Sequence, residues 1–279
     1  MNKPQGYLKM IRTGDWIKFY PLFPLAGAYL AAGISIDSIT VFVLFSCVTG
    51  YGFVINNLYD AEIDRNHPGK IKQGKNPLAD RMISKEETIG MCAVLAGIPL
   101  LLSFTIPGTG FVFTLLCLIA LTLYSATPVR LKDWFAGDII CHGVMFGGLP
   151  FLAGYTLAGG GIPQLISLPA ASALICTLIC CEALIAHEIQ DYHEDLGTTY
   201  TTVVSIGRKN GVLLLGITGV FSVLILELMS WWFIVDVAVN AAILSFLLAY
   251  PLYSSREILR LAARRNCRLL LNNCISRIR

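Results

Sequence analysis

Long apolar runs alternate with short polar segments along almost the whole of this 279-residue chain. Only 14% of the residues are charged, whereas soluble domains carry about 25%. A helix needs roughly 17 to 25 mostly apolar residues to cross a bilayer. We therefore expect an all-α polytopic membrane protein with eight transmembrane helices, at about residues 18–36, 39–58, 88–106, 109–126, 135–158, 164–187, 211–228 and 231–254.

The lysines and arginines are confined to alternate polar segments. All 21 of them fall in the N-terminal segment, in three of the connections and in the C-terminal segment, while the other four connections carry none. Cytoplasmic segments of membrane proteins are enriched in Lys and Arg. This pattern predicts a cell-membrane protein with both termini in the cytoplasm. Residues 255–279 would then form a basic cytoplasmic tail lying on anionic membrane lipid.

A cluster of oxygen-bearing side chains follows the second apolar run, where residues 56–64 read Asn-Asn-Leu-Tyr-Asp-Ala-Glu-Ile-Asp. Asn56, Asp60 and Asp64 recur every fourth residue, so on a helix they form one stripe about 12 Å long. Carboxylate and amide oxygens suit Mg²⁺, which is commonly held by one or two carboxylates together with substrate phosphates. A solvated helix end is the simpler explanation for a single cluster of this kind.

A second cluster with the same spacing favours the metal-binding explanation. Residues 187–195 read His-Glu-Ile-Gln-Asp-Tyr-His-Glu-Asp after the sixth apolar run, with Asp191 and Asp195 again four residues apart. Four spans separate the two clusters, so both would lie at cytoplasmic helix ends and the two halves would run in the same sense. We expect a parallel 4+4 repeat whose two acidic stripes hold one diphosphate through bridging metal ions.

A third polar segment lies between these two motifs. Residues 124–132, after the fourth run, read Tyr-Ser-Ala-Thr-Pro-Val-Arg-Leu-Lys. Pro128 is expected to end or kink the helix. Arg130 and Lys132 would emerge on the same side as the acidic motifs, where cations suit a departing diphosphate, although positive-inside bias alone also explains them.

Three further ionisable residues are expected at membrane depth. Asp138 and His142 are four residues apart, so they can face each other or a cavity. Glu182 precedes Asp191 by nine residues, which places it on the opposite side of a straight helix. We expect Glu182 to pair with a neighbouring helix rather than join the metal site.

Taken together, these motifs resemble those of the UbiA superfamily of intramembrane prenyltransferases, and its archaeal-type branch in particular. The resemblance covers nearly the whole chain: eight spans, an N-x-x-x-D-x-x-x-D motif, a Y-x-x-x-P-x-R-x-K segment and a final D-x-x-x-D motif, in that order. It implies a single all-helical domain over residues 1–279. Its central cavity would open sideways to lipid and be capped by cytoplasmic loops.

The resemblance also implies roles for individual residues. Those implied as Mg²⁺ ligands are Asn56, Asp60, Asp64, Asp191 and Asp195. Those implied in catalysis are Asp60, Asp64, Asp191, Asp195 and Tyr124. Those implied in binding the substrate diphosphate are Asn56, Lys75, Arg130, Lys132 and Glu188.

The chain departs from the family pattern in two places. Members usually have Asp directly after the first Asn of the motif, where this chain has Asn57. The next loop usually contains Arg-Pro, a small residue and Gly, whereas residues 75–81 read Lys-Asn-Pro-Leu-Ala-Asp-Arg. A different cation would then contact the phosphate, and the candidates are Lys70, Lys72, Lys75 and Arg81.

The expected activity is Mg²⁺-dependent transfer of a prenyl group from an allylic diphosphate to a lipophilic acceptor within the membrane. An aromatic ring, a prenylglycerol phosphate and a carotenoid-like molecule all remain open as acceptors, and Asp191 or Glu188 would take the acceptor's proton. Three alternatives are a cyclase of the same superfamily, a secondary transporter and a non-catalytic scaffold. Transporter sites lie near the bilayer midplane, whereas these motifs lie at its edge. Membrane lipid is an expected partner and nucleic acid is not.

Overall fold

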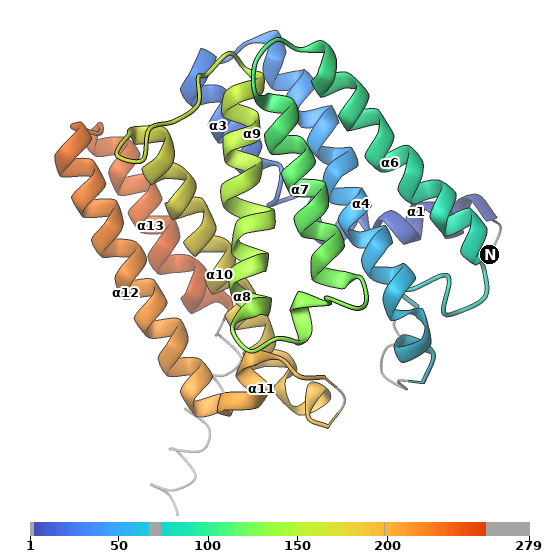
Figure 1. Ribbon diagram of the computed structural model, residues 1–279. Coiled ribbons are helices and arrows are strands. Elements are labelled where there is room, and N and C mark those ends of the chain that lie inside the picture. Colours follow the sequence, from blue (N-terminus) through green and yellow to red (C-terminus); the bar gives the residue numbers. More distant parts are fainter. Residues whose placement is uncertain (1–2, 67–73, 198, 255–279) are drawn as a thin grey trace, which may run out of the picture. The chain divides into compact units, whose positions relative to one another are not determined.

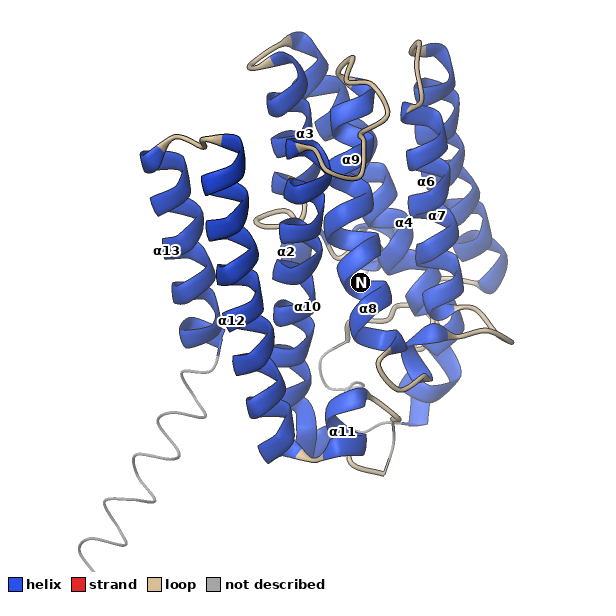
Figure 2. Ribbon diagram, turned by 60° about the vertical axis from the view of Figure 1, so that its left-hand side comes forward, coloured by secondary structure: helices blue, strands red, loops and turns tan. Residues whose placement is uncertain are grey.

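The computed structural model describes residues 3–66, 74–197 and 199–254, and the regular structure of these residues is entirely helical (Figures 1 and 2). The basic tail expected at 255–279 lies outside them. The elements are α1 (Lys3–Ile11), α2 (Thr13–Trp16), α3 (Leu22–Ala32), α4 (Ile36–Asn66), α6 (Lys85–Thr105), α7 (Gly110–Ser125), η1 (Leu131–Asp133), α8 (Gly137–Gly143), η2 (Val144–Gly148), α9 (Leu149–Leu157), α10 (Leu168–Asp195), α11 (Thr202–Ile206), α12 (Arg208–Phe233) and α13 (Val237–Ser254).

The predicted all-α membrane class is confirmed. Within the described residues, five helices are long and apolar enough to cross a membrane, namely α4, α6, the continuous stretch Gly137–Leu157 formed by α8, η2 and α9, α10, and α12. Shorter apolar helices, α3, α7 and α13, lie where the other three spans were expected. The count of eight spans stays a prediction. α4 continues to Asn66, well past the predicted end of that span, so the first acidic motif is helical.

The chain forms two compact units, one of residues 1–181 with 200–202 and the other of residues 182–199 with 203–279. In the first unit, α4 packs against α3, α6 and α7, and α9 packs against α3 and α7. The apolar side chains of Leu44, Phe45, Val48 and Val54 on α4 are almost completely buried by these contacts. Figure 1 shows α6, α4, α7 and α9 running side by side along most of their lengths.

The contact between α3 and α9 depends on small residues. A Cβ atom added to Gly27 of α3 would lie 2.0 Å from the carbonyl oxygen of Phe151. A Cβ atom added to Gly154 of α9 would lie 1.9 Å from the carbonyl oxygen of Pro24. Glycine at such positions lets the backbones of two membrane helices approach closely.

Buried polar side chains also join helices inside each unit. In the second unit, Ser222 of α12 donates a hydrogen bond to the buried Glu182 of α10, which confirms the expected pairing with a neighbouring helix. In the first unit, Asp138 and His142 have separate partners. Asp138 accepts a bond from the Thr202 backbone N–H (2.5 Å), whereas the ring of His142 lies 3.2 Å from the Tyr20 hydroxyl. Each of these two side chains therefore has a polar partner outside α8.

Candidate active site

The first acidic motif lies in the last turns of α4, with both of its carboxylates largely buried. Asp60 and Asp64 are each 8% exposed. Asn56, one turn earlier, donates from Nδ2 to the Ser125 hydroxyl at 3.3 Å. Because the amide nitrogen of Asn56 is the donor in this bond, its carbonyl oxygen is the atom that can ligate a cation. This contact also fixes the end of α7 against the motif.

Asp60 is held by both cations of the segment between α7 and α8. The Arg130 guanidinium donates to Oδ1 of Asp60 at 2.9 Å, and the Lys132 ammonium lies 2.6 and 2.5 Å from its two oxygens. Arg130 adopts a left-handed backbone conformation (φ 42°) where η1 begins, and its Nε also bonds Asp133 at 2.6 Å. The structure therefore brings three of the predicted site residues together across about 70 residues of chain.

The two cations respond differently to this environment. Burial lowers the pKa of the Lys132 ammonium, although the charge of Asp60 opposes the shift. Burial also disfavours charge on Arg130, but the neighbouring Asp60 and Asp133 outweigh it and raise the pKa of Arg130. Lys132 is therefore the more easily deprotonated of the two cations beside Asp60.

Asp64 has a partner that sequence reasoning missed. Asn76 donates from Nδ2 to Oδ2 of Asp64 and to the backbone carbonyl of Asn57, both at 2.9 Å. Asn76 precedes Pro77 and so occupies the place where the family pattern has arginine. At this position the chain carries a neutral amide that orients the metal-ligand candidate. Sequence reasoning missed Asn76 because its two hydrogen bonds depend on tertiary contacts, which produce no periodic pattern in the sequence.

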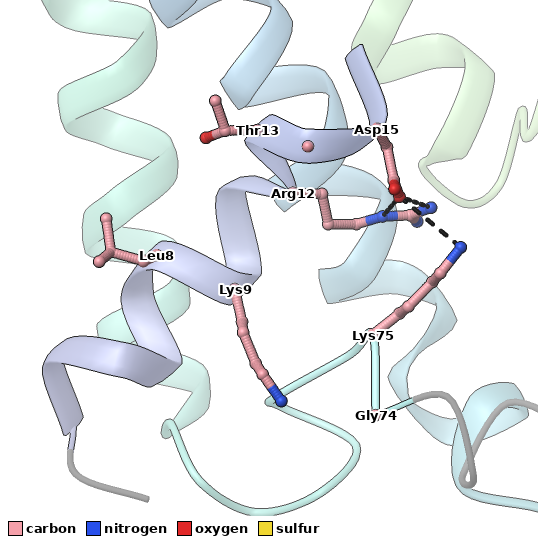
Figure 3. Close-up of a pocket in the computed structure, with 8 residues that line it drawn as sticks. Leu8, Lys9, Arg12, Thr13, Asp15, Gly74 and Lys75 are labelled. Carbon is pink, nitrogen blue, oxygen red and sulfur yellow. Dashed lines mark hydrogen bonds and ion pairs between the residues drawn. The ribbon is translucent and has the colours of Figure 1, made fainter. Parts of the chain in front are cut away.

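Of the four cations that are candidates to replace that arginine, Lys75 contacts the N-terminal helices. The Lys75 ammonium lies 3.7 Å from a carboxylate oxygen of Asp15, beside Arg12 (Figure 3). Arg81 is exposed, and Lys70 and Lys72 lie outside the described residues. Lys75 therefore lies beside the N-terminal helices and not beside Arg130 and Lys132, the two cations that contact Asp60.

Tyr124, the remaining candidate in the first unit, is half-buried at the end of α7. Its ring centroid lies 6.5 Å from that of His142, whose ring is 4.8 Å from Phe146. The ring of Tyr20 stacks on Phe146 at 4.3 Å. Tyr124 therefore adjoins a cluster of aromatic rings next to Ser125, the residue that bonds Asn56.

The second acidic motif belongs to the other unit. The side chain of Asp191 is 41% exposed and lies 3.4 Å from His187, while Asp195 ends α10. Glu188 behaves differently, because it is only 4% exposed and accepts a bond at 3.1 Å from the backbone N–H of Val203 in the first turn of α11. Asp191 is thus open to a ligand, while Glu188 helps to satisfy the start of a helix.

The donors on α4 fit a magnesium ion that is completed by its substrate. Among the residues that the structure describes, no group of three or more His, Cys, Asp or Glu side chains is arranged to hold a metal ion. Mg²⁺ commonly needs only one or two carboxylates, with waters and substrate phosphates filling its other positions. Asp60, Asp64 and the Asn56 carbonyl oxygen offer such a partial set.

The departure at Asn57 has a structural reason that can be tested. Asn57 is 2% exposed, and its amide donates to the backbone carbonyl of Met10 at 3.3 Å. A carboxylate cannot donate this bond and would bury a charge there. We expect Asn57→Asp to lower the free energy of unfolding by about 2 to 3 kcal/mol, measured by denaturation in detergent. Asn66→Asp, at an exposed site on the same helix, is the control, and equal losses in both variants would contradict the explanation.

Known proteins are similar to this chain in sequence. The model of the UbiA prenyltransferase family matches residues 21–275. Digeranylgeranylglyceryl phosphate synthase of Methanocaldococcus jannaschii is 26% identical over 215 residues, which are 76% of this chain and 69% of that protein.

Solved structures share the fold. A UbiA homologue from Archaeoglobus fulgidus bound to GPP and Mg²⁺ superposes with a TM-score of 0.75 at 24% identity, covering 89% of this chain and 86% of that one. A digeranylgeranylglyceryl phosphate synthase gives a TM-score of 0.67 at 21% identity, covering 95% of both chains. With the family model matching most of its length, the chain belongs to the UbiA prenyltransferase family and is a prenyltransferase of the membrane.

Proposed function

We propose that this protein transfers a prenyl group, with Mg²⁺, from an allylic diphosphate to a lipophilic acceptor that is a prenylglycerol phosphate. The proposal depends mainly on one observation: Asp60, a candidate metal ligand, forms ion pairs with Arg130 and Lys132, two candidates for binding the diphosphate. The choice of acceptor is supported by the Methanocaldococcus relative, which is a digeranylgeranylglyceryl phosphate synthase. The choice of metal is supported by the Archaeoglobus homologue, which binds GPP with Mg²⁺.

In the reaction, the bond between C1 of the prenyl group and the diphosphate oxygen breaks, and its electron pair leaves with the diphosphate. Mg²⁺ bound by the two acidic motifs would neutralise charge on that leaving group. Arg130 and Lys132, which neutralise Asp60 here, would turn to the diphosphate oxygens and stabilise the charge that develops on them. Tyr124 and the aromatic rings beside it would shield the allylic cation from water.

The acceptor hydroxyl then attacks C1 and loses its proton. Asp191 and Glu188 are the two candidates for receiving it. We assign this role to Asp191, because its carboxylate is partly exposed. The carboxylate of Glu188 is buried and already accepts a hydrogen bond from the Val203 N–H. In this assignment Glu188 positions the segment that follows the second motif.

The proposal includes the arrangement in the membrane. A single domain over residues 1–279 would cross the cell membrane eight times as a parallel 4+4 repeat around a central cavity, with both termini and the capping loops in the cytoplasm. The alternation of basic and Lys/Arg-free segments supports this orientation. A family model that runs from residue 21 to 275 supports the single domain.

The test is product formation by purified protein in detergent. Geranylgeranyl diphosphate, geranylgeranylglyceryl phosphate and Mg²⁺ should give the doubly prenylated glyceryl phosphate and free diphosphate, detected by mass spectrometry. Removing the metal with EDTA should abolish both, and added Mg²⁺ should restore them. Diphosphate release with a cyclic hydrocarbon and no need for an acceptor would instead indicate a cyclase. No Mg²⁺-dependent release with any prenyl length would contradict the proposal.

The lowered pKa of Lys132 predicts the alkaline limit of the reaction. As pH rises, Lys132 should lose its proton below the ordinary lysine range, so kcat/KM for the diphosphate should fall there. In Lys132→Arg the guanidinium stays charged, and the fall should move to higher pH. Profiles for wild type, Lys132→Arg and the control Lys85→Arg would be compared; superimposable profiles for wild type and Lys132→Arg would assign the alkaline fall to another group.

A further inference from the structure

A pocket of about 330 Å³ opens beside the N-terminal helices, apart from the cations on Asp60. It is lined by α1, by α2 and by the start of the segment that precedes α6, and Figure 3 shows the lysines and arginine that border it. Its polar lining contains three cationic side chains and one acid: Lys9, Arg12 and Lys75 with Asp15.

The single acid neutralises only part of this charge. The Arg12 guanidinium contacts one oxygen of Asp15 at 2.8 and 2.7 Å, and the Lys75 ammonium lies 3.7 Å from the same oxygen. Burial alone would raise the pKa of the Asp15 carboxyl, but Arg12 and Lys75 lower it below its ordinary value. Asp15 is therefore ionised at neutral pH, and the lining of the pocket keeps an excess of positive charge for an anion.

Both walls of the pocket are fixed to the helix that carries the first acidic motif. The Arg12 guanidinium lies 5.0 Å above the ring of Phe53 on α4. Asn57 of α4 bonds the Met10 carbonyl of α1, and its own carbonyl accepts a bond from Asn76, the neighbour of Lys75.

These attachments lie on the face of α4 that leads to the acidic motif. Residues 53, 57, 60 and 64 are separated by four, three and four positions, so their side chains share one face of the helix. Phe53 and Asp60 are about 10 Å apart along the helix axis. A ligand in the pocket would therefore lie beside the same face of α4 as Asp60 and Asp64, about two helical turns from Asp60.

An apolar groove on the same N-terminal helix suggests that the anion is attached to a hydrocarbon chain. This groove, of about 410 Å³, is formed by Tyr7 and Ile11 of α1 with Met91, Val94 and Leu95 of α6. Its residues on α1 directly precede Leu8 and Arg12 of the basic pocket. Cations beside an apolar surface suit an amphipathic molecule better than a free anion.

We infer that the pocket binds the phosphate of a glycerol lipid, and that this lipid is the prenyl acceptor. The inference rests on the proposed function for its choice of acceptor. Lys9, Arg12 and Lys75 would hold the phosphate. The free hydroxyl of the glycerol is only a few bonds from that phosphate, so it would be presented toward the first acidic motif. Lys75, which the sequence analysis assigned to the diphosphate, is here assigned to the phosphate of the acceptor.

The first test separates the KM values of the two substrates. Lys9→Ala, Lys75→Ala and the double variant remove exposed lysines whose loss should not unfold the protein. Each single variant should raise KM for geranylgeranylglyceryl phosphate about tenfold, with KM for geranylgeranyl diphosphate unchanged. Wild type should prefer this acceptor to geranylgeranylglycerol, which lacks the phosphate, and the double variant should lose that preference. Lys85→Ala, an exposed lysine outside the pocket, controls for net charge.

A second test measures binding without turnover. Geranylgeranylglyceryl phosphate would be titrated into wild type and the double variant, with intrinsic tryptophan fluorescence, to which the buried Trp16 of α2 contributes, as the signal. Weaker binding by the double variant would support the pocket even if no transfer occurred, in which case the proposed function alone would fail. Equal binding and an equal acceptor KM in wild type and double variant would overturn the inference.

A third arm identifies the source of the phosphate. Activity at saturating acceptor would be compared in nanodiscs of phosphatidylglycerol and of phosphatidylcholine. Wild-type activity could depend on phosphatidylglycerol, and this dependence could disappear in the double variant while the acceptor KM stays unchanged. That result would assign the pocket to a bilayer lipid and overturn its assignment to the acceptor. Independence from the bilayer lipid together with the raised acceptor KM would establish the acceptor.

Discussion

Asp60→Ala is expected to lower kcat/KM for prenyl transfer by about a thousandfold or more, the scale of losing a principal stabiliser of transition-state charge. The substitution removes a proposed metal ligand. It also removes the anion that positions Arg130 and Lys132, whose contacts with Asp60 are between 2.5 and 2.9 Å. Initial rates of diphosphate release at several concentrations of prenyl diphosphate and Mg²⁺ would measure the loss.

Asp133→Ala is the matched control for this experiment. Asp133 lies on the same segment and also bonds Arg130, but its side chain is 40% exposed. Activity should stay within about threefold of wild type, because exposed ion pairs contribute little. Unfolding curves for both variants would show that each is folded. An Asp60→Ala protein that is folded and as active as Asp133→Ala would place the metal site elsewhere.

The sequence predicted the parts of this site that local periodicity determines. Asn56, Asp60 and Asp64 share a helix face because their spacing matches the helical repeat, and α4 extends through all three. Membrane topology then placed Arg130 and Lys132 on the same side as these residues. Their ion pairs with Asp60 were not predicted from the sequence, which assigned both cations to the diphosphate; the structure shows these pairs.

The rest of the site depends on tertiary contacts that leave no pattern along the chain. Asn76 orients Asp64 through an amide, and Asn57 anchors α1 through a backbone carbonyl. Both bonds join segments that only the folded chain brings together. The sequence likewise could not distinguish a ligand-binding Glu188 from one that bonds the N–H of Val203, since a carboxylate in the same motif suits either role.

Gly154→Ala is expected to destabilise the first unit by about 3 kcal/mol or more, near the upper end for overpacking a buried contact. The added methyl group would lie 1.9 Å from the carbonyl oxygen of Pro24, which is backbone and cannot rotate away. α3 and α9 would have to separate, and the facing contact of Gly27 with the Phe151 carbonyl would separate with them. Thermal unfolding in detergent, followed by tryptophan fluorescence, would measure the change.

Gly97→Ala is the control with the same chemistry at an open position. Nothing lies within 4 Å of a Cβ atom added to Gly97 of α6, so alanine there should be neutral or stabilising, by up to about 1 kcal/mol from helix propensity. The two variants add the same methyl group to the interior of a helix. A difference between them therefore reports the close approach of α3 and α9. Equal stability would mean that these helices do not pack through their glycines.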